Sequence, residues 1–151
     1  MKTILITIVA VLLVGCGEPL YEASKEGKTD EVKKLLAEGA NINSTTDYYS
    51  ETPLHFAAEN SQTEVVELLI DKGADLNAKA KWERTPLHGA AKTGNADIIK
   101  LLTEAGADPN QKDFENKTPL DEAIKAKATE TADLLRKHGS KTGEELKAAG
   151  N

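Results

Sequence analysis

The sequence T-P-L-H at residues 52–55 returns unchanged at 85–88, and it returns as T-P-L-D at 118–121, at intervals of 33 residues. Other segments keep the same register, since G-A-D-L-N at 73–77 returns as G-A-D-P-N at 106–110. A fixed period of this length is typical of stacked repeats, in which each unit buries its apolar surface against its neighbours. The Leu, Val and Ile pairs within each unit recur at helical spacing, so the sequence predicts an all-α domain.

A further copy lies upstream, where E-P-L-Y-E-A-S at 18–24 fits the same pattern at a spacing of 34 residues. We place the extra residue in the loop before Thr52. The chain is therefore expected to hold four repeats and then a polar tail, which forms no more than a loose, fraying helical turn or two. The predicted bounds are 18–51, 52–84, 85–117 and 118–140 for the repeats and 141–151 for the tail.

The fourth repeat departs from the third at two places. Lys127 stands where the third repeat has Gly94 between its helices, and E-T-A at 130–132 replaces the region of Ile98 and Ile99. The terminal unit of a stack has a neighbour on one side only, so it has less apolar surface to hide. We expect these substitutions to mark a polar capping repeat.

The 33-residue period with T-P-L-H resembles the ankyrin-repeat family. The resemblance implies a solenoid of about four helix-turn-helix repeats joined by β-hairpin loops. It also implies structural roles for His55 and His88, which in that family form hydrogen bonds within and between neighbouring loops. The proline of each T-P-L-H begins a helix where its missing N–H costs nothing, and the preceding threonine caps that start. Left-handed backbone is expected at the glycines that end the second helices, Gly39, Gly73, Gly106 and Gly139.

The beginning of the chain has a different composition. Lys2 precedes a short apolar stretch, as in a secretory signal peptide, and the stretch is too short to span a bilayer comfortably. L-V-G-C at 13–16 resembles the lipobox of bacterial lipoproteins. The resemblance implies that residues 1–15 are removed, that Cys16 is diacylated, and that 16–17 tether the repeats to a membrane. Two alternatives stay open for this cysteine: an incidental thiol in an uncleaved anchor, or a residue of an ordinary signal peptide.

The same resemblance predicts a location. Because Gly17 follows the cysteine where aspartate would signal retention, the family's sorting rule favours the outer membrane, facing the periplasm, in a Gram-negative source. The cell envelope is thus the expected compartment.

No constellation of residues for catalysis occurs in the sequence. There is no nucleophile elbow, zinc-protease helix, phosphate-binding glycine loop or cysteine pair. His55 and His88 are one repeat apart, which is too far to share a metal ion. A formal net charge of −6 without any basic run is unsuited to binding phosphate backbones. We therefore expect no enzymatic activity, no metal or other cofactor, and no nucleic-acid partner.

Candidate binding residues lie in the loops that precede each T-P-L-H. Four of the six aromatic residues fall there, and a loop tip is a poor place to bury a ring for stability. Tyr and Trp, with Arg, are the residues most enriched at binding hot spots. Phe56 adds a ring on the first helix of its repeat, at a position that lines the concave surface in the family. The predicted partner-binding residues are Tyr48, Tyr49, Phe56, Lys81, Trp82, Arg84 and Phe114.

The sequence leaves two points open. In the alternative interpretation, the aromatic rings bind no partner and instead lie flat on adjacent loops, where they brace the hairpins. The loops also depart from the family pattern, because the glycine expected two residues before each threonine is Ser50, Glu83 or Asn116. Glutamate tolerates left-handed backbone poorly, which leaves the orientation of Trp82 open.

The sequence thus favours a monomeric, membrane-anchored protein-binding module of the bacterial envelope that captures a protein partner, as an accessory or immunity protein does. The alternative is a structural envelope lipoprotein, a scaffold that contacts lipid or the cell wall.

Overall fold

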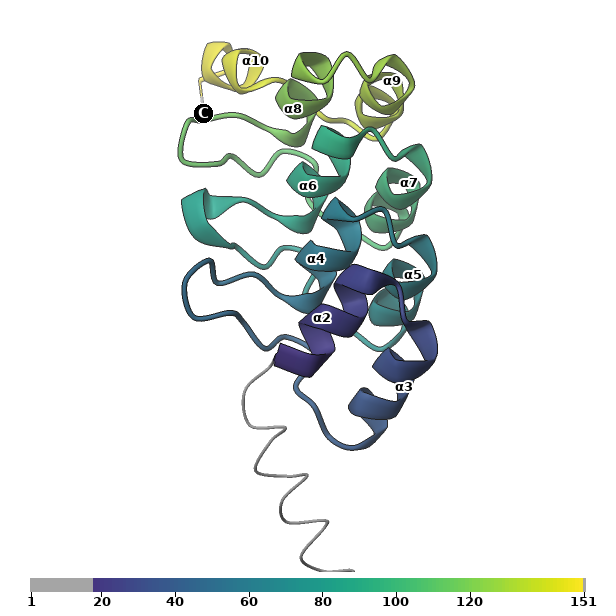
Figure 1. The fold of residues 1–151 in the computed structure, drawn as a ribbon. Coiled ribbons are helices and arrows are strands. Elements are labelled where there is room, and N and C mark those ends of the chain that lie inside the picture. The colour runs from purple at the N-terminus through teal and green to yellow at the C-terminus, as the bar shows by residue number, and fades with distance from the viewer. Residues whose placement is uncertain (1–17, 151) are drawn as a thin grey trace, which may run out of the picture.

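The computed structural model describes residues 18–150, so the predicted signal peptide, lipobox and lipidated Cys16 lie outside the described residues. Within that range the chain forms four stacked helix pairs (Figure 1), and no residue is assigned to a strand. This confirms the predicted all-α solenoid. The first helices of the pairs are α2 (Glu18–Glu26), α4 (Pro53–Glu59), α6 (Pro86–Thr93) and α8 (Pro119–Lys125). The second helices are α3 (Thr29–Ala37), α5 (Thr63–Asp71), α7 (Ala96–Glu104) and α9 (Thr129–Lys137).

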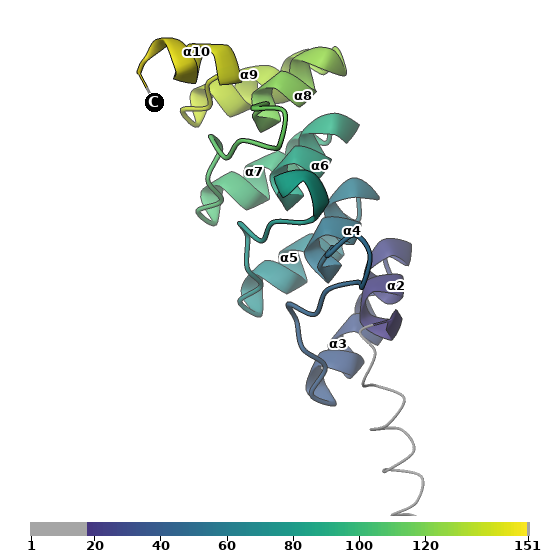
Figure 2. The same ribbon diagram turned by 90° about the vertical axis from the view of Figure 1, so that its left-hand side faces the viewer.

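The first and second helices form two parallel columns, and the loops between repeats project to one side of the first column (Figure 1). Figure 2 shows this loop edge turned toward the viewer. We call these loops the fingers: finger one is 44–51, finger two is 78–84 and finger three is 111–117. Finger two contains a short 3-10 turn, η1 (Lys81–Glu83). The repeat thus presents one irregular edge beside a regular helical core.

The core lies between the two columns and between successive repeats. Leu54, Leu87 and Leu120 occupy the same place in three repeats, and each is completely buried. A fully buried leucine contributes about 1.5–3 kcal/mol relative to an exposed one. Small residues at the helix contacts let the first helices approach closely. The second helices instead contribute β-branched residues to the core. The buried alanines of the first helices include Ala57, Ala58, Ala90 and Ala91, and the buried branched residues of the second helices include Val65, Val66, Ile98 and Ile99.

Each T-P-L-H motif ties a helix start to the base of the next finger. The backbone N–H of Thr52 donates to Nδ1 of His55 over 3.2 Å. Because that nitrogen is an acceptor, the proton of the neutral ring is on Nε2, which donates to the carbonyl oxygen of Arg84 over 3.1 Å. His88 repeats this arrangement with Thr85 and with the carbonyl oxygen of Lys117, at 3.1 and 3.2 Å. The two histidines therefore have the structural role that the family resemblance implies.

A second line of hydrogen bonds joins the repeats where the second helices end. The Oδ1 atom of Asn43 accepts from the backbone N–H of Asp75 over 2.9 Å. Asn77 and Asn110 repeat this bond one unit further along, at 2.8 Å each, and the last donor is the N–H of Lys141. Asparagine at this position therefore sets the spacing between neighbouring repeats.

The substituted residues of the fourth repeat face solvent only in part: Lys127 and Glu130 are exposed, whereas Thr131 and Ala132 are not. Thr131 is 1% exposed and Ala132 is 6% exposed, because their side of α9 packs against α7. The predicted polar cap at 130–132 is therefore wrong for these two residues. Lys127 adopts the left-handed backbone of the glycine it replaces, with φ of 58° against 72° at Gly94. Its side chain is exposed, so the substitution changes the backbone strain and leaves the packing alone.

The C-terminal tail forms the expected short helical segment, α10 (Gly143–Ala148), but this helix is capped and not loose. It begins at a capping box formed by Thr142 and Glu145. The side chain of Asp121 accepts from the N–H of Gly143 over 2.8 Å, and Thr118 Oγ1 donates to the carbonyl oxygen of Lys141 over 2.7 Å. The carbonyl oxygen of Lys141 directly precedes Thr142 as that of Arg84 precedes Thr85, so Thr118 here bonds the group that His55 bonds in an earlier repeat. Thr142 thus begins α10 as Thr118 begins α8, so α10 has the place of the first helix of a fifth repeat, but no finger precedes it.

Candidate protein-binding surface

The three fingers share one feature of backbone geometry despite their different sequences. Ser50, Glu83 and Asn116 all adopt left-handed backbone, with φ of 53°, 59° and 60°. Finger two contains a second such residue, Trp82, with φ of 60° and ψ of 25°. Left-handed backbone costs a residue with a side chain about 1–2 kcal/mol. The replacement of the expected glycines therefore strains the fingers and does not change their turn.

Hydrogen bonds between fingers set the tips side by side. The N–H of Lys81 donates to the carbonyl oxygen of Tyr49 over 2.7 Å, and the N–H of Phe114 donates to that of Trp82 over 2.9 Å. Each bond runs from the fourth residue before a threonine to the third residue before the threonine of the preceding repeat. The tips are thus fixed relative to one another, and the two consecutive left-handed residues of finger two lie between these bonds.

Four of the predicted residues form one cluster, which we call the fingertip cluster: Tyr48, Tyr49, Lys81 and Trp82. The two tyrosine rings meet edge to face with centroids 4.7 Å apart, and Tyr49 lies 6.2 Å from the Trp82 ring. The Lys81 ammonium lies 3.7 Å from the Tyr48 centroid and 4.9 Å from that of Trp82. Tyr48 stays 70% exposed, Trp82 55% and Tyr49 45%. The rings therefore brace one another and still present a broad apolar surface.

The other two predicted aromatic residues lie apart from this cluster. Phe114 is 73% exposed at the tip of finger three. The ring of Phe56 stacks on Tyr21 of α2, with centroids 5.1 Å apart and planes 28° from parallel. The sequence does not indicate Tyr21 as a binding residue, because it lies on α2 and outside the fingers. The available signal was its register, since Tyr21 occupies the position that His55 and His88 have in their repeats.

A groove runs between the fingers and the first helices. One hollow, of about 230 Å³, lies beside finger two and α4, and a second, of about 430 Å³, lies between fingers two and three and α8. Three residues line both hollows: Trp82, Arg84 and Lys92. A Cβ atom at Gly89 of α6 would lie 2.5 Å from Cγ of Glu59, so a side chain there would displace Glu59, which lines the smaller hollow.

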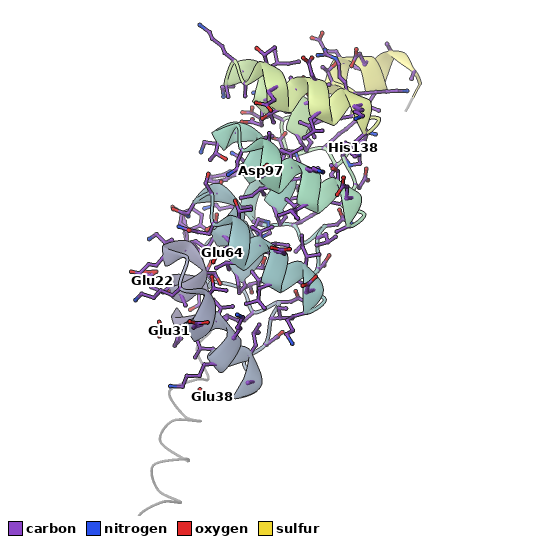
Figure 3. The ribbon with its side chains drawn as sticks, turned by 90° about the vertical axis from the view of Figure 1, so that its right-hand side faces the viewer. Glu22, Glu31, Glu38, Glu64, Asp97 and His138 are labelled. Carbon is purple, nitrogen blue, oxygen red and sulfur yellow. The ribbon has the colours of Figure 1, made fainter. Side chains whose placement is uncertain are left out.

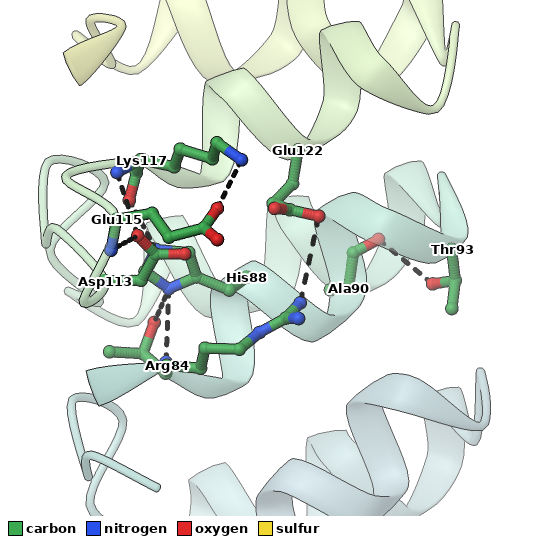
Figure 4. A network of polar contacts seen from close by, with 9 residues as sticks. Arg84, His88, Ala90, Thr93, Asp113, Glu115, Lys117 and Glu122 are labelled. Atoms are coloured by element: carbon green, nitrogen blue, oxygen red, sulfur yellow. Dashed lines mark hydrogen bonds and ion pairs between the residues drawn. The ribbon is translucent and has the colours of Figure 1, made fainter. Parts of the chain in front are cut away.

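Arg84 lies in the groove and reaches from finger two toward α8 (Figure 4). Its Nη2 atom is 3.9 Å from Oε2 of Glu122, which is within ion-pair range but too long for a hydrogen bond. That nitrogen is sealed from solvent, and no acceptor within residues 18–150 lies in hydrogen-bonding range of it. An unsatisfied buried donor costs about 1–3 kcal/mol. The Nη2 end of Arg84 is therefore held beside Glu122 by charge and not by a hydrogen bond.

Some of the acidic residues around the groove already have partners within the protein. Asp113 Oδ1 accepts from the backbone N–H groups of Glu115 and Lys117, at 2.9 Å each, so it belongs to the structure of finger three. The carboxylate of Glu115 pairs with the Lys117 ammonium. In the smaller hollow, burial and then the nearby charge of Glu59 raise the pKa of Glu51 above its ordinary value.

The opposite face of the molecule has a different character. Figure 3 shows the side formed by the second helices, where Glu64 and Asp97 occupy equivalent, exposed positions in the first turns of α5 and α7. Acidic residues there complement the helix dipole. The exposed large hydrophobic residues of the described chain are Tyr48, Tyr49, Trp82, Phe114 and Ile124, and none of these lies on a second helix. Apolar exposure is thus concentrated on the side of the fingers and first helices.

Two further properties bear on the chemistry. Among residues 18–150, no group of histidine, cysteine and carboxylate side chains is arranged to hold a metal ion. Across the same stretch, no helix combines the length and the apolar character needed to cross a membrane.

A stack of helix pairs with fingers and a groove on one side defines a class of repeat protein that presents a surface for binding. Comparison with protein families identifies it, since a model of ankyrin repeats (3 copies) matches residues 5–80 and a model of ankyrin repeats (many copies) matches 69–123. The chain belongs to the ankyrin-repeat family. Members of this family are generally non-catalytic protein-interaction modules, and the chain is accordingly a protein-binding module.

Similar curated proteins share the repeats over short segments. The chain is 48% identical over 46 residues to GA-binding protein subunit beta-2 of Mus musculus, which covers 30% of this chain and 11% of that protein. It is 58% identical over 33 residues to ankyrin repeat and KH domain-containing protein 1 of Homo sapiens, covering 22% and 1%. The matches thus span no more than about a tenth of the length of these relatives.

Proposed function

We propose that this protein captures a protein partner at the bacterial cell envelope, with the fingertip cluster and the adjoining groove as its binding surface and Cys16 as its lipid anchor. The observation that carries the binding surface is the exposure of Tyr48, Tyr49, Trp82 and Phe114 on consecutive fingers. Aromatic side chains bury much apolar area with few rotatable bonds, and they dominate the energetics of interfaces. Lys81 and Arg84 supply charge at the edge of this apolar surface, as in other interfaces.

The proposed anchor rests on the sequence around Cys16. L-V-G-C at 13–16 supplies the lipobox pattern, and α2 begins at Glu18, two residues after the cysteine. Two or more acyl chains give stable membrane attachment. A linker this short holds the first repeat close to the membrane surface and limits the swing of the stack.

The binding surface is tested with the double variant Tyr49→Ala/Trp82→Ala, by affinity capture from the native envelope. The matched control is Glu67→Ala/Lys100→Ala, which changes equivalent exposed positions of α5 and α7 on the opposite face. We expect the first variant to lose one specific protein while circular dichroism shows the fold intact, and the control to keep it. Retention of every partner by the folded Tyr49/Trp82 variant would show that this cluster is not the binding surface.

The anchor is tested separately with Cys16→Ser. We expect this variant to move from the membrane fraction to the soluble fraction and metabolic labelling with a fatty acid to stop. Continued membrane attachment of Cys16→Ser contradicts lipidation at this residue and leaves the test of the fingers unaffected.

The scaffold alternative has one observation in its favour. Tyr and Trp with nearby Lys are also enriched where proteins contact the membrane interface. Sedimentation of the Cys16→Ser protein with vesicles of bacterial phospholipid, and with isolated cell wall, distinguishes the two. Binding that depends on Tyr49 and Trp82 supports the scaffold, whereas its absence supports a protein partner.

A further inference from the structure

We propose that the partner is an extended protein segment that places an Asp or Glu side chain in the larger hollow, where Arg84 binds its carboxylate between Trp82 and Phe114. This inference rests on the proposed protein-binding function and specifies the chemistry of the segment that the groove receives.

Arg84 occupies the junction of the groove. It lines both hollows, and its backbone carbonyl oxygen is fixed by the 3.1 Å hydrogen bond from Nε2 of His55. Its side chain is 25% exposed, while the buried Nη2 atom lies on the side of Glu122. The anchored backbone limits the freedom that Arg84 would lose on binding. It is therefore partly ordered in advance for recognition.

The guanidinium group has five N–H donors in a planar fork, which suits a carboxylate better than any other side-chain group. The 3.9 Å contact with Glu122 uses the charge of Arg84 without making a hydrogen bond. A small rotation of the fork onto a carboxylate in the groove would satisfy these donors. The arrangement in the free protein thus leaves hydrogen-bonding capacity for a ligand.

The charges around the larger hollow direct an acid to that place. Asp113 and Glu115 are occupied within finger three, and Glu122 is the one acidic residue lining this hollow that contacts Arg84. Lys92 and Lys125 line the helical wall opposite the fingers. Each hollow is lined by three basic residues, but Glu51 and Glu59 of the smaller one form no ion pair within residues 18–150 and would repel a carboxylate. Because Asp113 and Glu115 are already occupied within finger three, an acidic side chain fits better beside Phe114.

The aromatic walls add the second requirement. Trp82 and Phe114 flank the larger hollow and are 55% and 73% exposed. Apolar residues next to the acid would cover these rings and remove water from the new ion pair, which strengthens it. The expected motif is thus an Asp or Glu next to one or more apolar residues.

The test uses a displayed library of random linear peptides selected on the full chain. We expect the selected peptides to share an Asp or Glu beside apolar residues. Arg84→Gln should weaken their binding by about tenfold or more, the usual loss for a hydrogen bond to a charged group. Arg136→Gln is the matched control, because Arg136 is the other arginine of the chain and lies exposed on α9. This control should bind as the wild type does.

Two further measurements separate recognition from stability. Glu122→Gln removes the competing carboxylate and should tighten binding of the acidic peptides several-fold, an effect that a merely structural ion pair would not produce. Changing the peptide's acid to its amide should weaken binding to the wild type and have little further effect on Arg84→Gln. Such non-additivity is the signature of a direct pair.

The outcomes distinguish this inference from the proposed function. If the peptides lose affinity for Tyr49→Ala/Trp82→Ala but bind folded Arg84→Gln as tightly as wild type, the carboxylate site is overturned and the binding surface stands. If both variants bind the peptides normally, or if no peptide is selected, the carboxylate site is overturned, and affinity capture with Tyr49→Ala/Trp82→Ala decides the binding surface separately. Thermal unfolding of each variant confirms that binding is compared between folded proteins.

Discussion

The ammonium group of Lys81 lies 3.7 Å from the centre of the Tyr48 ring, although the two residues hold equivalent positions in consecutive fingers. The repeat therefore places a cation where its predecessor places a ring, and the two interact across the interface between units. The same ammonium lies 5.2 Å from the Tyr49 centroid, so one lysine serves several rings at once.

Replacing Lys81 with methionine should destabilise the protein by about 0.5–1 kcal/mol, the value of an exposed cation–π contact. Methionine keeps an unbranched apolar side chain, so the change removes chiefly the charge. Urea unfolding followed by circular dichroism measures the loss. Lys100→Met on α7 is the control, and an equal loss there would show that general charge accounts for the effect.

Gly143→Ala should detach α10 from the fourth repeat. A Cβ atom at this position would lie 1.9 Å from the carbonyl oxygen of Asn116, which no side-chain rotation relieves because the obstacle is backbone. We expect a loss of about 1–3 kcal/mol from the hydrogen bonds that join α10 to Thr118 and Asp121.

Hydrogen exchange at the N–H of Gly143, or of Ala in the variant, follows this detachment directly. Lys141→Ala serves as the control, because residue 141 contributes its backbone groups to the junction and its side chain is exposed. Unchanged protection in Gly143→Ala would mean that finger three can move aside.

Stability should fall as the pH decreases through the range in which His55 resists protonation. Burial lowers the pKa of His55 from 6.5 to about 4. Between these values the unfolded chain binds a proton that the folded chain excludes, so the free energy of unfolding rises with pH and is lost toward acid. The expected loss between about pH 7 and about pH 4 is on the order of 3 kcal/mol from this residue.

Urea unfolding across this pH range tests the assignment. His55→Gln should be less stable at neutral pH and should show a shallower dependence on pH than the wild type. His88→Gln should act in the same direction, because burial also lowers the pKa of His88. A variant at His55 that keeps the full slope would assign the acid sensitivity to other groups.

Lys127→Gly should stabilise the protein by up to about 1 kcal/mol, because the residue has φ of 58° and its repeat equivalent is Gly94. The gain is limited by the greater chain entropy that glycine gives the unfolded state. Thermal unfolding measures it. Lys125→Gly, at the end of α8, should instead lose about 0.5–1 kcal/mol, and stabilisation by both changes would refute the backbone argument.

The parts of the fold that could be predicted are those set by repeated single residues. Thr52 and Pro53 specify a helix start by themselves, and the equivalent residues of other repeats do the same, so the four helix pairs follow from spacing alone. The docking of α10 on the fourth repeat does not follow from this spacing. Thr142 follows Thr118 by 24 residues, and a search at a period of 33 passes over it.

The candidate site depends on relations between positions that are not equivalent. Arg84 belongs to the return of a finger and Glu122 to the first helix of the next repeat, so no periodic comparison pairs them. The fingertip residues were found because exposed rings in loops are unusual by composition. Which rings meet depends on the hydrogen bond from Lys81 to Tyr49, and residue types do not reveal a bond between backbone groups.

The hydrogen bonds that join one repeat to the next use equivalent residues along the stack. His55 bonds the carbonyl oxygen of Arg84 as His88 bonds that of Lys117, and Asn43, Asn77 and Asn110 follow one another in the same way. A second copy of residues 85–117 inserted after Lys117 would therefore meet its usual partners on both sides. The molecule can thus be lengthened by whole units, with a longer groove, while α2 and α10 continue to close its ends.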